Sequence, residues 1–167
     1  MQMNLVTPQM LTKDQWAVLR DAPHLVVVAI SASGGTRLDA LLERAAGTRA
    51  IGDGKNNDHP LVRAIAVPAE MEIAMSSIEA RTRDSRGSLR PPAELMQLAT
   101  DSVRQAAEVL RSVGSELDLY GYREYVMGVA RSVAEAARDD DFVGLGGRLV
   151  SDAERAVLAS VSQALSS

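Results

Sequence analysis

The sequence contains no cysteine and very few aromatic residues. Without cysteine there can be no disulfide, no thiolate zinc site, no iron–sulfur cluster and no cysteine nucleophile. The aromatic fraction is 3%, whereas hydrophobic residues in total make up 46%, so the core must be aliphatic. An aliphatic core suits closely packed helices better than strands, which favour aromatic and β-branched residues. We therefore expect an all-α protein.

Long hydrophobic runs and an excess of positive charge are also missing. The longest apolar run covers residues 25–30, far below the roughly 20 residues that span a bilayer. No secretory signal is visible, because Pro8 interrupts the short apolar start and the first basic residue is Lys13. The net charge of −4 disfavours nucleic-acid binding. We expect a cytoplasmic protein with no membrane and no nucleic-acid partner. Only Lys13 and Lys55 among the 18 basic residues are lysines, a bias that indicates a GC-rich, bacterial genome.

Apolar periodicity and helix-start signals divide the first 90 residues into short helices. Thr12 and Gln15 have the spacing of a capping box, at the start of a helix over residues 12–21. Pro23 fits the first turn of a second helix, which covers residues 24–32. The Val-rich run within it leaves a strand as the alternative. Further helices are predicted over residues 36–46, over residues 60–67 and from Pro68 onward, with a loop over residues 47–58. Two buried stripes are expected on them: Leu38, Leu41, Leu42 and Ala45, and then Met71, Ala74, Met75 and Ile78.

The second half has the clearest pattern. Residues 92–113 and 116–138 each carry an apolar seam whose members alternate in steps of three and four. The seams are Met96, Ala99, Val103, Ala106, Leu110 and Val113, and Leu119, Tyr122, Val126, Val129, Val133 and Ala136. A two-residue connection, Gly114 and Ser115, predicts an antiparallel αα-hairpin packed through these seams. Gly121 and Gly128 predict close helix contact. With a last helix over residues 152–165, capped by Ser151 and Glu154, we expect one domain over residues 1–167, a compact bundle of six or seven helices.

An acidic turn precedes that last helix. Asp139, Asp140 and Asp141 resemble the opening of an EF-hand calcium loop, with Gly144 at the required sixth position. The fifth and twelfth positions are Val143 and Val150, which supply no side-chain oxygen. A looser carboxylate site that combines Asp140 or Asp141 with Glu154 is the alternative. The pattern favours a solvated acidic turn, and we predict no metal site.

Motifs for catalysis or cofactor binding are incomplete. The glycines at 144, 146 and 147 lack the preceding strand and third glycine of a dinucleotide-binding turn, and residues 52–56 lack the Ser or Thr of a phosphate loop. His24 and His59 are the two histidines; neither follows a Glu by three, so a di-iron centre of the ferritin type is not expected. Both are interpreted as residues of first helical turns. No catalytic residue and no cofactor is predicted, and the protein is not expected to be an enzyme.

The most polar connection, residues 82–92, carries four arginines in and beside it: Arg81, Arg83, Arg86 and Arg90. Such a cluster can bind phosphates or an acidic partner. Asp84 dilutes its charge and no aromatic residue is interleaved as a stacking platform. We expect an exposed, mobile and charged loop.

The order helix, Gly-rich break, capped helix occurs twice, at residues 29–46 and 129–165. With the opening Leu-Thr-x-x-Gln-Trp-x-x-Leu-x-x-Ala-Pro, it resembles a widespread bacterial family of small helical proteins of unassigned function. More distantly, the acidic turn followed by Ser151-Asp152-Ala153-Glu154 is similar to tellurite-resistance TerB-like proteins. That resemblance implies duplicated helical domains whose acidic turns are linked to metal.

Together these features predict a non-catalytic structural, adaptor or assembly protein that acts through helix faces. The alternative is a TerB-like stress-response module that binds a divalent cation through the acidic turn. Seven methionines and few aromatics give adaptable apolar faces, for which six or seven short helices offer limited cover. We therefore expect a homo-oligomer, with any other protein partner left open.

Overall fold

The computed structural model describes residues 4–139 and 151–167, and these residues form an all-α bundle, as predicted. Its seven α-helices are α1 (Lys13–Ser33), α2 (Arg37–Asp53), α3 (Pro60–Ile65), α4 (Pro68–Thr82), α5 (Pro92–Val113), α6 (Glu116–Asp139) and α7 (Asp152–Ser166). Two short 3-10 helices, η1 (Pro8–Met10) and η2 (Gly54–Asn56), complete the set. In this part of the chain no helix combines the length and apolar character required to cross a bilayer.

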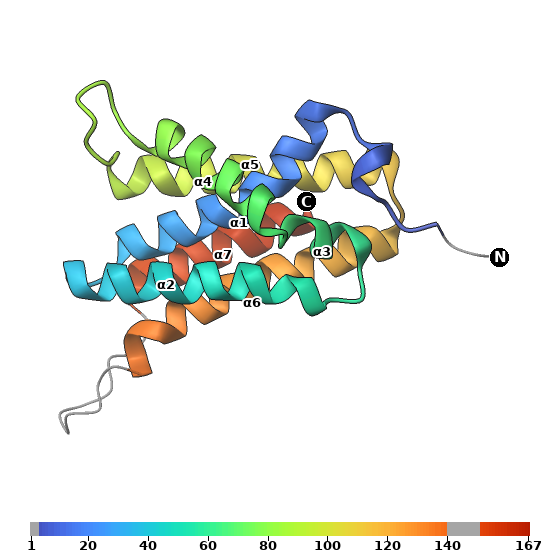
Figure 1. Ribbon diagram of the computed structural model, residues 1–167. Helices are drawn as coiled ribbons and strands as arrows, with labels where there is room; N and C mark the ends of the chain where they lie inside the picture. Colours follow the sequence, from blue (N-terminus) through green and yellow to red (C-terminus); the bar gives the residue numbers. More distant parts are fainter. Residues whose placement is uncertain (1–3, 140–150) are drawn as a thin grey trace.

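Helix α1 is the centre of the bundle. It packs against α2, α4, α5, α6 and α7, and most of its residues between positions 19 and 31 are buried. Figure 1 shows α1 and α7 between α4 and α5 on one side and α2 and α6 on the other. A helix that is apolar nearly all round can bury every face only in such a position, so its composition explains its place.

The predicted break before Pro23 is wrong: α1 is one continuous helix that contains Pro23. The strand alternative for residues 25–30 is wrong as well. A proline inside a helix has no N–H to donate to the carbonyl four residues earlier, here that of Leu19. The hydroxyl of Tyr122, which is fully buried, donates a hydrogen bond of 2.9 Å to the Leu19 oxygen instead. A side chain from α6 therefore satisfies the carbonyl that Pro23 leaves without a helical partner.

Helix α2 continues through the stretch that the sequence predicts to be a loop. It starts at a capping box of Thr36 and Asp39 and ends only at Asp53. Gly47 is buried where three helices meet: a Cβ atom there would lie 2.5 Å from Val27 Cγ1 and 2.9 Å from Val133 Cγ2. Gly47 is thus not a loop residue but the position that allows α1, α2 and α6 to approach closely.

The stripe predicted for the buried side of α2 faces the wrong way. Leu38 and Leu41 are 61% and 66% exposed, whereas the buried residues of this helix are Glu43, Gly47 and Ile51. Because Gly47 fixes the side of closest approach, the leucines lie on the outside. On α4 the predicted stripe is correct for Ala74 and Ile78, but Met75 is 53% exposed.

The hairpin helices have the predicted extents, to within one residue at the end of α6. They run antiparallel from the connection at Gly114 and Ser115 (Figure 1). Val103 and Val129 are buried as predicted, but α5 packs mainly on α1 and α6 mainly on α2, while α7 contacts both. The two seams therefore do not pack chiefly on each other, because α1 offers an apolar surface on every side.

The two glycines of α6 differ in their surroundings. A Cβ on Gly121 would lie 3.0 Å from His59 Cδ2, which confirms the close contact predicted there. A Cβ on Gly128 would have no atom of another described helix within 4 Å, so the same prediction is wrong at that position.

Candidate functional site

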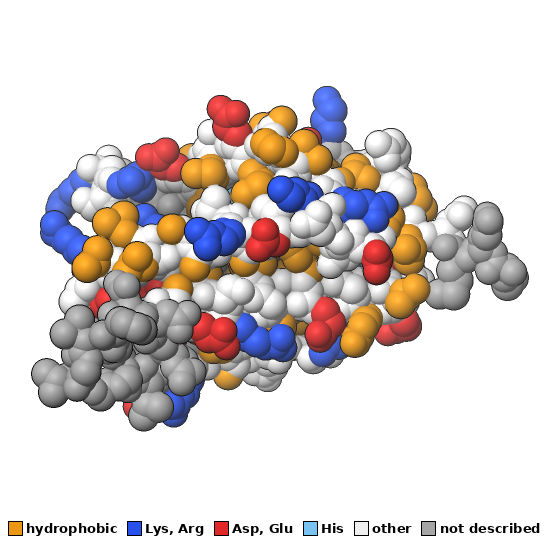
Figure 2. Space-filling view, turned by 60° about the horizontal axis from the view of Figure 1, so that its bottom comes forward, with side chains coloured by type: hydrophobic (Ala, Val, Ile, Leu, Met, Phe, Trp, Pro, Cys, Tyr) orange, Lys and Arg blue, Asp and Glu red, His pale blue; other side chains and the backbone are white. Residues whose placement is uncertain are grey.

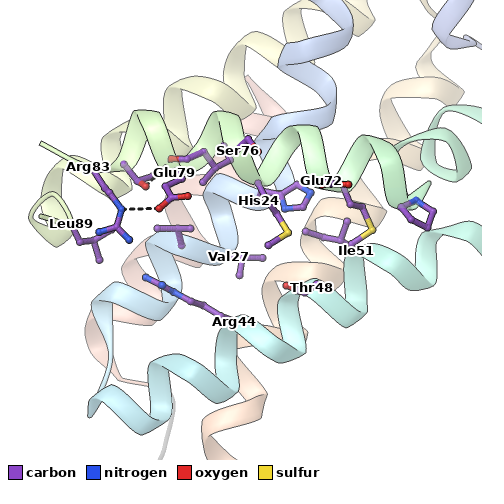
Figure 3. A pocket seen from close by; sticks show the side chains of 16 residues that line it. His24, Val27, Arg44, Thr48, Ile51, Glu72, Ser76, Glu79, Arg83 and Leu89 are labelled. Atoms are coloured by element: carbon purple, nitrogen blue, oxygen red, sulfur yellow. Dashed lines mark hydrogen bonds and ion pairs between the residues drawn. The ribbon is translucent and has the colours of Figure 1, made fainter. Parts of the chain in front are cut away.

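A groove lies between α2 and α4, with α1 as its floor. Its volume is about 630 Å³, within the 300–1,000 Å³ range of ligand pockets. The apolar part of its lining comes from all three helices and from the turn after α4, and includes Val27, Val28, Ile51, Met71, Ile78 and Leu89. Figure 3 shows these elements around the groove, with α2 and α4 as its walls. The groove is thus an apolar hollow formed by segments distant in sequence.

His24 contributes a polar group to this apolar lining. Its side chain belongs to α1, lines the groove, and is only 6% exposed (Figure 3). Nε2 is buried and has no hydrogen-bond partner among the described residues. Burial lowers the pKa of His24 to about 4; the Asp21 carboxylate raises it by less, and Arg20 lowers it. The imidazole is therefore neutral at pH 7. The prediction that His24 is a first-turn residue is wrong, because this residue lies in the middle of α1.

The two walls of the groove carry charges of opposite sign. Arg44 stands on the α2 wall, and Glu72 and Glu79 stand on the α4 wall (Figure 3). Glu79 forms an exposed ion pair with Arg83, with 3.4 Å between Oε1 and Nε. Neither the Arg44 nor the Glu72 side chain has a hydrogen bond or ion pair with any described residue. Two acidic and two basic side chains line the groove, so its net charge is zero with His24 neutral.

His59 lies elsewhere, in a network whose members all have partners. It is the N-cap of α3, and its Nδ1 accepts a hydrogen bond from the Leu61 N–H at 3.2 Å. The proton of the neutral ring is then on Nε2, which donates to Asp118 Oδ1 at 3.0 Å. Both ring nitrogens are occupied, so His59 is not available to a substrate in this arrangement. Its prediction as a helix-start residue is confirmed.

Asp118 is the fully buried centre of that network. It also accepts hydrogen bonds from the Val6 N–H at 2.7 Å and from the N–H and hydroxyl of Ser115. Burial alone would raise the pKa of Asp118, but the hydrogen bonds from Ser115 and Val6 and the nearby His59 together hold this pKa below its usual value. The pKa of His59 is lowered as well. Burial is the largest cause of this shift, and Asp118 opposes it. The network ties the N-terminal segment to the α5–α6 connection.

The acidic turn can be followed only in part. Asp140 and Asp141, with the loop positions Val143, Gly144 and Val150, lie outside the described residues. Glu154 is buried and completes a capping box with Ser151, at 2.9 Å from the Ser151 N–H. Among residues 4–139 and 151–167, no group of three or more His, Asp or Glu side chains could hold a metal ion. The prediction of no metal site at the acidic turn, and its alternative of a bound cation, both stay untested.

The loop at residues 83–89 is exposed, as expected, whereas Arg81 and Arg90 are only partly exposed, and most of the cluster's charge is engaged within the chain. Three of the four arginines form ion pairs: Arg81 with Asp21 at 4.0 Å, Arg83 with Glu79 at 3.4 Å and Arg90 with Glu94 at 3.3 Å. The Asp84 carboxylate accepts hydrogen bonds from the N–H groups of Arg86 and Ser88 and so fixes the turn. This turn contributes Arg83 and Leu89 to one end of the groove (Figure 3).

The sequence does not predict the groove. Arg44, Thr48 and Glu72 belong to no motif, and only the methionines of α4 give a signal, as adaptable apolar residues. Comparison with known proteins adds no assignment: no family model, no curated protein and no solved structure matches this chain.

Proposed function

We propose that this protein is a non-catalytic assembly protein that binds a second copy of itself through the walls of the groove. The observation that supports it is the exposure of apolar side chains on both walls. Met75 is 53% exposed on α4, and Leu89, after α4, is 39% exposed. On α2, Leu41 is 66% exposed and lies three residues before Arg44, on the same helix face. Exposed apolar residues that cluster on one face mark contact sites.

The charges of the two walls favour a second copy as the occupant. A two-fold axis parallel to the groove would set the α2 wall of one subunit against the α4 wall of the other. Arg44 and Glu79 lie opposite each other across the groove in Figure 3. The same axis would therefore pair Arg44 of each subunit with Glu79 of the other subunit, which gives two such pairs per dimer. Figure 2 shows hydrophobic side chains in small groups among charges of both signs. Such a mixed surface suits a self-complementary contact better than attraction to a highly charged polymer.

Charge exchange tests this arrangement directly. Light scattering should give a mass above 17.8 kDa that rises with protein concentration. Arg44→Glu and Glu79→Arg should each lower it toward that of one chain, because each places like charges together. An equimolar mixture of the two variants should regain the assembly, because the mixed dimer has an opposite-charge pair at both positions. The control is Arg104→Glu, which makes the same charge change at an exposed ion pair on α5.

Two results would contradict the proposal. A wild-type mass that stays at 17.8 kDa at every concentration excludes the second copy as occupant. An assembly that neither variant weakens belongs to another face.

A further inference from the structure

The groove has the volume and lining of a small-molecule site, and His24 gives it one recognition group. We propose that it binds a neutral, largely apolar small molecule whose single hydroxyl or comparable group forms a hydrogen bond with His24. This inference goes beyond self-association and does not depend on it, since it concerns a molecule bound inside the groove rather than a second copy against the exposed side chains of its walls.

The lining defines the body of this molecule. Val27, Val28 and Ile51 offer aliphatic carbon, and Met71 supplies a flexible side chain that can adapt to a ligand's shape. Binding sites for small molecules are mostly apolar, with a few placed polar groups that fix orientation. At about 630 Å³, the groove is large enough for a chain or ring system of ten or more carbons.

His24 defines the polar group. Buried polar atoms in proteins nearly always have a hydrogen-bond partner, yet Nε2 of His24 has none in the described structure. Eight of the fifteen other residues that line the groove are apolar. A hydroxyl fits either tautomer of a neutral imidazole, because it both donates and accepts. A ligand that carries one would satisfy an atom that the chain itself leaves unpaired.

The charge balance defines the net charge of the ligand. Arg44 and Arg83 equal Glu72 and Glu79 in number, and all four residues are exposed to solvent, so the lining offers a carboxylate or an ammonium group no net or buried countercharge. Transfer of an uncompensated charge into such an apolar hollow is strongly unfavourable. The site should therefore discriminate a neutral alcohol from its charged analogues of equal length.

Fluorescence of the neutral probe N-phenyl-1-naphthylamine tests the site. The probe should bind wild-type protein, and Thr48→Trp, which adds bulk at an exposed position of the α2 wall, should weaken its binding at least tenfold. Ser162→Trp, which adds the same side chain at an exposed position of α7, is the matched control and should change nothing. Equal binding by both variants would overturn the location.

Competition then tests the chemistry. 1-Decanol should displace the probe at lower concentration than decanoate or decylammonium does. His24→Leu should weaken 1-decanol about tenfold, as expected for one neutral hydrogen bond, once the probe's own affinity for each variant has been measured. The same variant should melt at a higher temperature, because it removes a buried polar atom without a partner. Preference for either charged analogue, or full 1-decanol affinity in His24→Leu, would overturn the assignment.

Discussion

The two histidines are buried to the same extent but differ in what surrounds them. His24 and His59 are each 6% exposed. Both ring nitrogens of His59 have partners, Leu61 N–H and Asp118, whereas Nε2 of His24 has none among the described residues. Because an unpaired buried polar atom costs about 1–3 kcal/mol, the two sites contribute to stability with opposite sign. Burial therefore does not distinguish a structural residue from a candidate binding residue. The distinction is whether each buried polar atom has a hydrogen-bond partner.

The largest expected effect comes from breaking the satisfied site. Asp118→Ala removes the acceptor shared by His59, Val6 and Ser115 and leaves their buried donors without a partner. We expect a loss of about 4 kcal/mol in the free energy of unfolding, measured by urea denaturation. Asp101→Ala is the control: this carboxylate is 46% exposed in a surface ion pair, so its loss should have little effect. A comparable loss in both variants would show that the network has no special weight.

A smaller effect is expected from pH, which acts on the unsatisfied site. The pKa of His24 is about 4 in the folded protein and 6.5 when unfolded, so the unfolded chain binds more protons between these values. The free energy of unfolding should therefore keep its full contribution from His24 above pH 6.5. It should fall as the pH drops toward 4, by about 3 kcal/mol in total from this residue. Denaturation at pH 7.0, 5.5 and 4.5 measures this slope.

The matched variant identifies the residue responsible for that slope. His24→Leu should flatten the profile, leaving the dependence that the lowered pKa of His59 produces in the same direction. An unchanged profile in His24→Leu would assign the pH dependence to other groups.

Helix limits that rest on neighbouring residues could be predicted from the sequence, whereas those that rest on distant partners could not. The capping boxes at Thr12 and Ser151 involve residues three apart, and both are present. Pro23 has the sequence signal of a helix start. The Tyr122 hydroxyl that lets the helix continue lies about a hundred positions away, so the local sequence does not reveal it. Gly47 has the sequence signal of a loop residue. The neighbours that require a glycine there come from two other helices, so the local sequence does not reveal this requirement. The groove could not be predicted for the same reason, since three helices and a turn create it.

The smallest effect tests whether a partner supplied from elsewhere satisfies a backbone group as the helix itself would. Tyr122→Phe removes the hydrogen bond to the Leu19 carbonyl and should cost about 1–2 kcal/mol, since that oxygen is left buried and unpaired. In a Pro23→Ala background, the new N–H at position 23 can donate to the same oxygen, so the loss of the hydroxyl should cost clearly less. The difference between the two losses is the coupling energy of a double-mutant cycle, measured by urea denaturation.

Tyr120→Phe, at a side chain that is 61% exposed, is the control and should be neutral. Equal losses with and without Pro23 would mean that the hydroxyl does not replace the missing helical N–H. No loss in either background would mean that Tyr122 stabilises the bundle only through its ring and that the helix tolerates the unpaired carbonyl. The unpaired nitrogen of His24 would then be equally tolerable, and its value as a sign of a binding site would be reduced.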